Sequence, residues 1–199
     1  MWALIEDGSI TKIINNPRGM IIDDIQYSRK IFSLWSKSEL EAKGIYEVVF
    51  NNTNKKDEAY YTNTNQSFAF ADGVVTASFG SATAKALADR NGTDEDGEEL
   101  DPVVVIKGLK TLKKEIIKQQ ASGLLTPTDW YIIRKADAGT AVLNAITTHR
   151  AAVRTKSGEM ETIIDNASDV DALAALYEYT EQEDGSHTRP LGEFPILEV

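Results

Sequence analysis

The spacing of apolar residues changes once along this chain, across a polar segment that carries several turn signals. Before that segment, apolar residues alternate with polar ones in short runs, and Asp-Gly pairs separate some of the runs. After it, apolar residues recur every three or four positions, which is the spacing of an amphipathic helix. We therefore predict an α+β chain with a β-rich N-terminal half and a small C-terminal helical bundle. The expected divisions are a β-rich domain at 1–88, an acidic linker or loop at 89–105, and a helical domain with an extended tail at 106–199.

The β-rich half is predicted to contain hairpins that turn at Asp-Gly pairs, at residues 7–8 and 72–73. Asp-Gly between apolar runs favours a type I′ turn, because both central residues of that turn need positive φ. In the second hairpin, a two-residue turn would place Phe70 opposite Val75. Alternation along the strands then puts one set of side chains on one face, namely Phe68, Phe70, Val75, Ala77 and Phe79. The other face takes Ser67, Ala69, Ala71, Val74, Thr76 and Ser78.

One short helix is expected between these hairpins. Ser36 followed by Glu39 three residues later is the pattern of a capping box, which marks a helix start. Gly44 stands where a left-handed residue would end the helix. The run Ile45–Phe50 then alternates as a strand does.

The helical half is predicted to begin with two helices. Apolar residues from Ile106 to Ile117 recur at helical spacing, and residues 122–123, Ser-Gly, are expected to end that helix. A capping box at Thr126 and Asp129, with Pro127 at the first helical position, predicts the start of the next one. The buried stripe of this second helix is expected to include Trp130 and Ile133.

Two further helices are expected after these. Apolar residues from Val142 to Ile164 predict a longer helix, in which residues 157–158, Ser-Gly, are a candidate interruption. A capping box at Ser168 and Asp171 predicts the last helix.

The charge balance narrows the classes of partner. The formal net charge of -10 disfavours nucleic acid and anionic membrane surfaces, because contact with their phosphates needs a local excess of Lys and Arg. No run of about 18 apolar residues is present, so no segment is expected to span a membrane. The first residues turn acidic at once, which is unlike a signal peptide.

The sequence offers no arrangement that suits catalysis or metal binding. Cysteine is absent, and there are two histidines, His149 and His187. His149 lacks a carboxylate one helical turn away that would make it a ligand or a base, and His187 lies in a polar tail. The acidic run Asp94–Glu99 departs from a calcium loop, because Gly92 stands where the first aspartate belongs. We expect no catalytic residue, no metal site and no cofactor. A carboxylate-based hydrolase stays as an alternative, since nothing selects or rejects a pair among the many acids.

Several apolar residues are candidates for an interface. Trp35 and Trp130 each lie beside a predicted helix start, where tryptophan either fills a core or anchors a protein–protein contact. Leu109, Leu112 and Ile116 are spaced by three and then four residues, as in a short coiled-coil seam. Burial against the rest of their own domain is the other interpretation of that stripe.

Two basic residues complete the candidate interface. Arg150 and Arg154 are four residues apart and therefore share one helix face. They would contact the carboxylates of a partner or, alternatively, nearby acids of this chain such as Asp129 and Asp137.

The segments Thr126–Arg134 and His149–Arg154 resemble the C-terminal region of tailed-bacteriophage tail-fibre assembly and tail-fibre-associated proteins. In that family a Thr-Asp-Trp segment is followed by a helix of the Tyr-Arg-x-x-Leu-Arg type. Leu191–Pro195 resembles the ending that often follows, and Phe32–Leu40 with Gly44–Tyr46 resembles a segment of tail proteins from marine and cyanobacterial phages. This chain departs from the family pattern with histidine for tyrosine at 149, leucine for proline at 143 and phenylalanine for tryptophan at 194.

The resemblance implies a non-enzymatic structural component of a phage virion, in the tail, fibre or adaptor region. The alternative within the same family is a tail-fibre assembly chaperone that is absent from the mature particle. The implied partners are other phage tail or fibre proteins, and a homo-oligomer is compatible with either role. Such a chain would be made in the host cytoplasm and, in the first role, reside in the virion tail. No functional site residue is carried over from the family.

Overall fold

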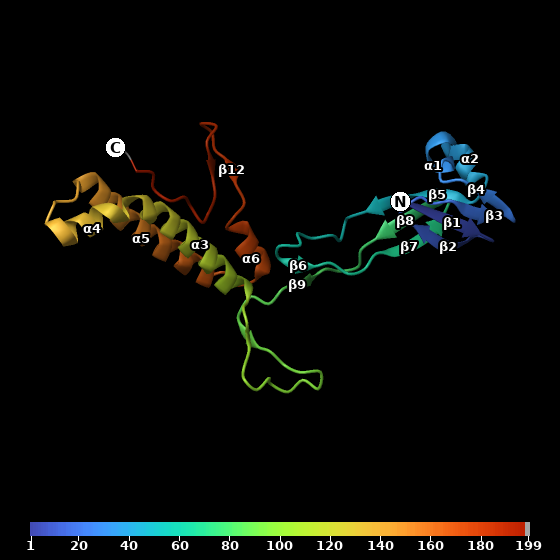
Figure 1. Cartoon of the computed structure of the whole chain (residues 1–199). Helices are drawn as coiled ribbons and strands as arrows, with labels where there is room; N and C mark the ends of the chain where they lie inside the picture. The colour runs from blue at the N-terminus through green and yellow to red at the C-terminus, as the bar shows by residue number, and fades with distance from the viewer. Residues whose placement is uncertain (198–199) are drawn as a thin grey trace. The chain divides into compact units, whose positions relative to one another are not determined.

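The computed structural model describes residues 1–197, which form two compact units (Figure 1). The first unit runs from Met1 to Thr83, and the second begins at Ala84. Strands dominate the first unit and helices the second, so the predicted α+β class is confirmed. The segment 89–105 belongs to the second unit.

A curled five-stranded sheet is the centre of the first unit, with the strand order β2-β1-β5-β8-β7 (Figure 1). Its strands are β1 (Trp2–Glu6), β2 (Ser9–Ile14), β5 (Ile45–Asn51), β7 (Ser67–Ala71) and β8 (Val74–Ser78). Neighbouring strands are antiparallel except β5 and β8, which run parallel.

Both predicted Asp-Gly hairpins are present. Asp72 and Gly73 have φ of 52° and 74°, as a type I′ turn requires, and residues 7–8 do the same between β1 and β2. The register across β7 and β8 pairs Phe70 with Val75, as predicted.

Around β1 the sheet is covered on both faces, because β1 sends apolar side chains to both sides. Ala3 and Ile5 join a cluster with residues from β5 and β8, and Ile10 and Phe68, from β2 and β7, pack against it. Leu4 joins a second cluster on the other face, which consists otherwise of Ile22, Ile31, Leu40 and Ile45. Since the two edge strands β2 and β7 both reach the first cluster, the sheet curls around it.

Short elements cover the second cluster. They are β3 (Met20–Ile22), β4 (Ile25–Tyr27), α1 (Ile31–Leu34) and α2 (Lys37–Glu41). The capping box at the start of α2 is confirmed, since the Ser36 hydroxyl accepts from the Glu39 N–H and the Glu39 carboxylate accepts from the Ser36 N–H. The sequence pattern predicted one short helix, and α1 is an addition to it. A short ribbon of β6 (Tyr61–Thr62) and β9 (Thr83–Ala84) completes the strands of this region.

The second unit is built on the long helices α3 and α5, which lie side by side (Figure 1). Its elements are β10 (Arg90–Asn91), β11 (Val105–Ile106), α3 (Leu109–Leu125), the 3-10 helix η1 (Thr126–Thr128), α4 (Asp129–Ala138), α5 (Asn144–Asp165), α6 (Val170–Ala175), β12 (Thr180–Glu181) and β13 (His187–Thr188). The core between the helices consists of Leu109, Ile117, Ala121, Ile146, Val153, Met160, Ile164, Val170, Leu173 and Leu191.

Polar contacts reinforce the α3–α5 pair along one side. Lys114 forms a 2.8 Å ion pair with Asp165, and Lys118 lies 3.3 Å from Glu161. Lys110 donates to the backbone carbonyl of Asp165. Three lysines of α3 therefore face the C-terminal turns of α5.

Several predicted helix limits in this unit are wrong. The first helix does not end at residues 122–123 but runs on to Leu125, because Thr126 keeps helical dihedrals and its hydroxyl donates to the carbonyl of Ser122. The capping box expected at Thr126 is therefore absent, and the chain turns through η1 into α4.

Later limits differ as well. Helix α5 is continuous through residues 157–158, where Gly158 has open space around it. The last helix is capped by Asp169, whose carboxylate accepts from the Ala172 N–H, and not by Ser168. The tail, expected to be extended, forms a small hairpin of β12 and β13.

The acidic segment before α3 is a hairpin and not a free linker. Strands β10 and β11 pair, and an isolated bridge joins Thr93 to Glu99 further out. At its base, Leu109 donates to the carbonyl of Ala86, and Asp89 accepts from the N–H of Gly108, the residue that precedes α3. The hairpin is thus tied to the start of α3.

Replacing Gly44 with alanine is expected to destabilise the first unit. Gly44 has φ of 73°, and a Cβ there would collide with the carbonyl oxygen of Ile5. Gly73 is a matched control, with φ of 74° but open space around it. G73A should cost the left-handed strain of about 1–2 kcal/mol, and G44A should cost about 1–3 kcal/mol more. Urea unfolding of both variants measures the difference, and equal losses would contradict the close approach of Gly44 to Ile5.

The contribution of Asp89 to stability is expected to depend on pH. The hydrogen bond from the Gly108 N–H, followed by one from Thr111, lowers the pKa of the Asp89 carboxyl below its usual 3.8. A lowered pKa in the folded state adds stability above the unfolded value and removes it as the pH falls through the folded value. The stability difference between wild type and D89N should be full above about pH 5 and shrink below 3.8. Thermal melts followed by circular dichroism test this, and a constant difference down to pH 2.5, about a unit below that value, would refute it.

Candidate interaction surface on the helical unit

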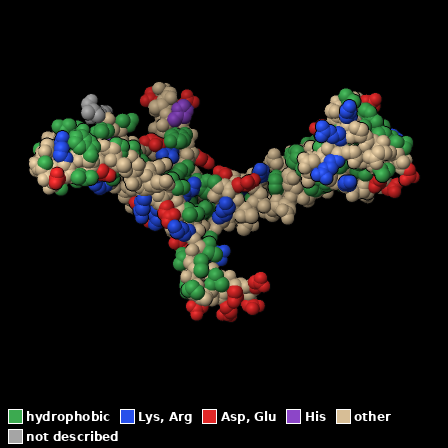
Figure 2. All heavy atoms as spheres, in the orientation of Figure 1, with side chains coloured by type: hydrophobic (Ala, Val, Ile, Leu, Met, Phe, Trp, Pro, Cys, Tyr) green, Lys and Arg blue, Asp and Glu red, His purple; other side chains and the backbone are tan. Residues whose placement is uncertain are grey.

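Helix α4 has no buried residue, although it carries three large apolar side chains. Trp130 is 49% exposed, Ile132 42% and Ile133 67%. Figure 2 shows hydrophobic side chains gathered over the α4 end of the helical unit. The expected buried stripe of Trp130 and Ile133 is therefore wrong, because both side chains stay largely exposed within the described part of the chain.

A buried arginine of α5 holds α4 in place. Arg150 is only 6% exposed, and its guanidinium lies 2.8 Å from the Asp129 carboxylate at the first residue of α4. The same guanidinium donates to the Leu125 carbonyl at 2.8 Å and to the Thr128 hydroxyl at 2.6 Å. One side chain thus joins α5 to the end of α3, to η1 and to the start of α4.

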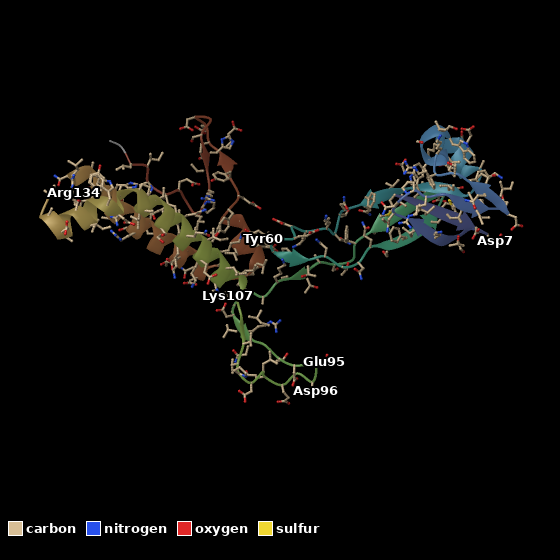
Figure 3. The ribbon with its side chains drawn as sticks, viewed as in Figure 1. Asp7, Tyr60, Glu95, Asp96, Lys107 and Arg134 are labelled. Carbon is tan, nitrogen blue, oxygen red and sulfur yellow. The ribbon has the colours of Figure 1, made fainter. Side chains whose placement is uncertain are left out.

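Arg134 orders the aromatic residues of α4 in turn. Its guanidinium carbon lies 4.5 Å from the centre of the Trp130 ring and 5.6 Å from that of Tyr131. Figure 3 labels Arg134 at this end of the unit. A guanidinium over an aromatic face is attracted by the ring's negative face. The Trp130 ring is therefore restricted while half of its surface stays exposed.

The two arginines singled out from the sequence have different roles in the structure. Arg150 is paired with Asp129, as one of the two interpretations proposed, and Arg154 is exposed. The recorded hydrogen bond of Arg154 within the described residues is a long one of 3.5 Å to the backbone carbonyl of Arg150. Arg154 therefore stays a candidate for contact with a partner.

The predicted stripe on α3 is divided between core and surface. Leu109 is buried, while Leu112 is 43% exposed and Ile116 45%. The buried side of the helix passes through Ile117 and Ala121. The stripe is therefore not fully buried against its own domain. Its partial exposure does not by itself show a coiled-coil seam, which stays a prediction.

Trp35 lies in the first unit and packs against the second of its two clusters. Its ring meets that of Tyr27 edge-on, with centroids 5.3 Å apart. It is half-buried, so a packing role describes its position better than an exposed anchor does.

A groove of about 430 Å³ runs between α3, the start of α4 and α5. Its walls carry Lys118, Arg150 and Arg154, with the carboxylates of Asp129 and Glu161. Its uncharged lining residues are Leu125 and the small residues Ala121, Ser122, Ser157 and Gly158. The sequence pattern did not predict this groove, because it depends on the pairing of two helices that are far apart in the chain.

Within residues 1–197, no group of three or more His, Cys, Asp or Glu is placed to hold a metal ion. His149 is buried in α5, which agrees with a packing role. Searched over the same residues, no helix combines the length and apolar character needed to cross a membrane.

Comparison of the chain with protein-family models, with curated proteins and with solved structures finds no match. The resemblance to phage tail-fibre proteins therefore stays a prediction.

Replacing Arg150 with methionine is expected to release α4. The variant keeps most of the buried volume but removes the guanidinium that donates to the Leu125 carbonyl and to the Thr128 hydroxyl. The Leu125 carbonyl keeps its hydrogen bond from the Thr128 hydroxyl. We expect a loss of about 2–3 kcal/mol, because hydrogen bonds from a charged donor are lost while the exposed Asp129 can rehydrate. R154M, one turn further along α5, should change stability by less than about 0.5 kcal/mol. Urea unfolding gives both values, and hydrogen exchange should rise across 129–138 in R150M alone. Similar losses for the two variants would contradict the assignment.

Proposed function

We propose that this chain is a non-enzymatic structural component of a phage tail, fibre or adaptor region, acting through protein–protein contacts. The observation that carries the proposal is helix α4, a ten-residue helix with no buried residue that presents Trp130, Ile132 and Ile133 to solvent. Helices of this length are marginal in water, and most of their stability comes from packing an apolar face. A partner that covers this face would supply the missing packing.

The chemistry of the face suits a protein partner. Exposed apolar patches on folded proteins mark contact sites, and tryptophan is enriched among the residues that dominate binding energy. Trp130 packs against Arg134, which restricts its ring, so less side-chain entropy is lost when a partner covers it. We call the exposed face of Trp130, Ile132 and Ile133 the α4 surface.

The phage assignment rests on the resemblance of Thr126–Arg134 and His149–Arg154 to the tail-fibre family. Both segments contribute to one local structure, since the ion pair of Asp129 and Arg150 joins them. Two segments that are distant in the sequence therefore combine to place α4, with its exposed residues, against the end of α5. The assignment remains our proposal.

An assembly chaperone for tail fibres is the second candidate, and the same α4 surface favours it. A chaperone holds its client through exposed apolar side chains and then leaves. A virion component would keep the same face covered permanently.

Replacing Ile133 with glutamate is expected to block incorporation without unfolding the chain. Ile133 is 67% exposed, so the change should alter stability by less than about 0.5 kcal/mol. A charge at the α4 surface would have to be desolvated on binding, which opposes the contact. I21E, at a similarly exposed isoleucine of the first unit, is the matched control. Peptide mass spectrometry on purified particles made with each variant measures incorporation.

The outcomes separate the candidates. Stoichiometric recovery of wild type and I21E, with loss of I133E, supports a virion component that uses α4. Recovery of the chain in the growing fibre complex but not in intact particles supports the chaperone. If I133E is incorporated as well as wild type, the α4 surface is not the contact.

A further inference from the structure

We propose that the groove between α3 and α5 binds the acidic tip of a second copy of this chain. The acidic tip is Asp94–Glu99, at the end of the hairpin of β10 and β11. The arginine groove is the cleft described above, with Lys118, Arg150 and Arg154 on its walls. This contact is separate from the α4 surface and does not depend on the proposed phage role.

The arginine groove has one cation in excess. Arg150 is paired with Asp129, and Lys118 is paired with Glu161. Arg154 has no ion pair among those recorded for residues 1–197 and lies within the same groove. A carboxylate entering the groove would therefore meet an unpaired guanidinium, whose planar fork suits a carboxylate.

A buried donor in the groove also lacks an acceptor. The side chain of Arg150 is only 8% exposed, and its Nε has no hydrogen-bond partner within the described structure. An unsatisfied buried donor of this kind costs free energy, about 1–3 kcal/mol for a typical polar group. Because Nε is itself shielded from solvent, an incoming oxygen atom would reach it only if the Arg150 side chain shifts on binding. This observation is independent of the charge count.

The small residues that line the groove leave room for an incoming chain. Ala121 and Ser122 on α3 lie across from Ser157 and Gly158 on α5. A Cβ added at Gly158 would meet no atom within 4 Å, which shows that the space above it is open. The volume of about 430 Å³ accommodates a few side chains of a loop.

The acidic tip has the complementary charge and a fixed shape. Asp94 accepts hydrogen bonds from the N–H groups of Asp96 and Glu98, so the loop is held by its own first residue. Glu99 is bound by Asn91, while Glu95 and Asp96 lie at the outer end of the loop (Figure 3). The carboxylates of this ordered projecting loop are complementary in charge to Arg154, the exposed guanidinium of the groove.

The partner in the arginine groove is a second copy of this chain, because the chain carries both the groove and the acidic tip. The net charge of -10 opposes association in general, so a contact between copies needs opposite charges placed face to face. The tip and the groove are two different surfaces, so the contact is heterologous. Repetition of a heterologous contact gives a ring or an open chain of copies.

Charge reversals on the full-length chain test the contact. R154E should weaken self-association at least tenfold, measured by light scattering and sedimentation across a concentration series. E95K/D96K should weaken it to a similar extent, and the combined variant R154E/E95K/D96K should restore it at least in part. The controls are K135E, which changes the net charge as R154E does, and E178K/E183K, which matches the tip variant in charge.

The tip variant separates a specific contact from general electrostatics. E95K/D96K reduces the net negative charge, so general repulsion alone would predict stronger association, as in E178K/E183K. Weaker association in the tip variant, with restoration in the combined variant, supports the proposal. A chain that stays monomeric at millimolar concentration overturns it. The proposal is also overturned if R154E, E95K/D96K and the combined variant all associate as strongly as wild type. It is equally overturned if only I133E loses association, because the contact between copies would then lie on the α4 surface.

Discussion

The guanidinium of Arg150 is the contact on which the end of the helical unit depends. Burying a charge is costly unless it is paired and hydrogen-bonded. Here the cost is offset by one carboxylate, one carbonyl and one hydroxyl, which come from consecutive elements of the chain. Because these acceptors lie at the end of α3, in η1 and at the start of α4, one side chain fixes the turn between the helices. The direction of α4, and with it the exposure of its apolar residues, follows from that turn.

The hydrophobic cores of the two units are built differently. In the first unit, one strand, β1, feeds two clusters on opposite faces of a curled sheet, and aromatic pairs such as Tyr27 with Trp35 close the second cluster. In the second, the core is a narrow band between two long helices, supported by ion pairs such as Lys114 with Asp165. A band of this kind leaves apolar residues at its margins, including Leu112 and Ile116.

Local signals predicted local structure well. The Asp-Gly turns, the register of Phe70 with Val75 and the capping box at Ser36 all depend on neighbours in the sequence, and all are present. The same kind of signal was wrong at Thr126, because α3 continues into that residue and keeps it helical. The parallel pairing of β5 with β8 joins segments far apart in the chain, which no local pattern encodes.

The candidate surface also shows that local sequence patterns do not predict contacts between distant segments. The period of Trp130 and Ile133 indicates that α4 has an apolar face, but a period cannot tell whether anything covers that face. The pairing of Arg150 with Asp129 could be proposed from residue types, whereas the arginine groove needs the packing of α3 on α5. Ile132 was missed because it falls outside the expected stripe.

The most direct test of the account is oxidative footprinting of Trp130 by hydroxyl radicals, in the free chain and in the assembled particle or fibre complex. Trp2 and Trp35, both packed within the first unit, serve as internal references. The account predicts that Trp130 reacts faster than these references in the free chain and is strongly protected in the assembly, while the references change little. Equal reactivity of Trp130 in the free and the assembled states would contradict the claim that α4 is the contact surface.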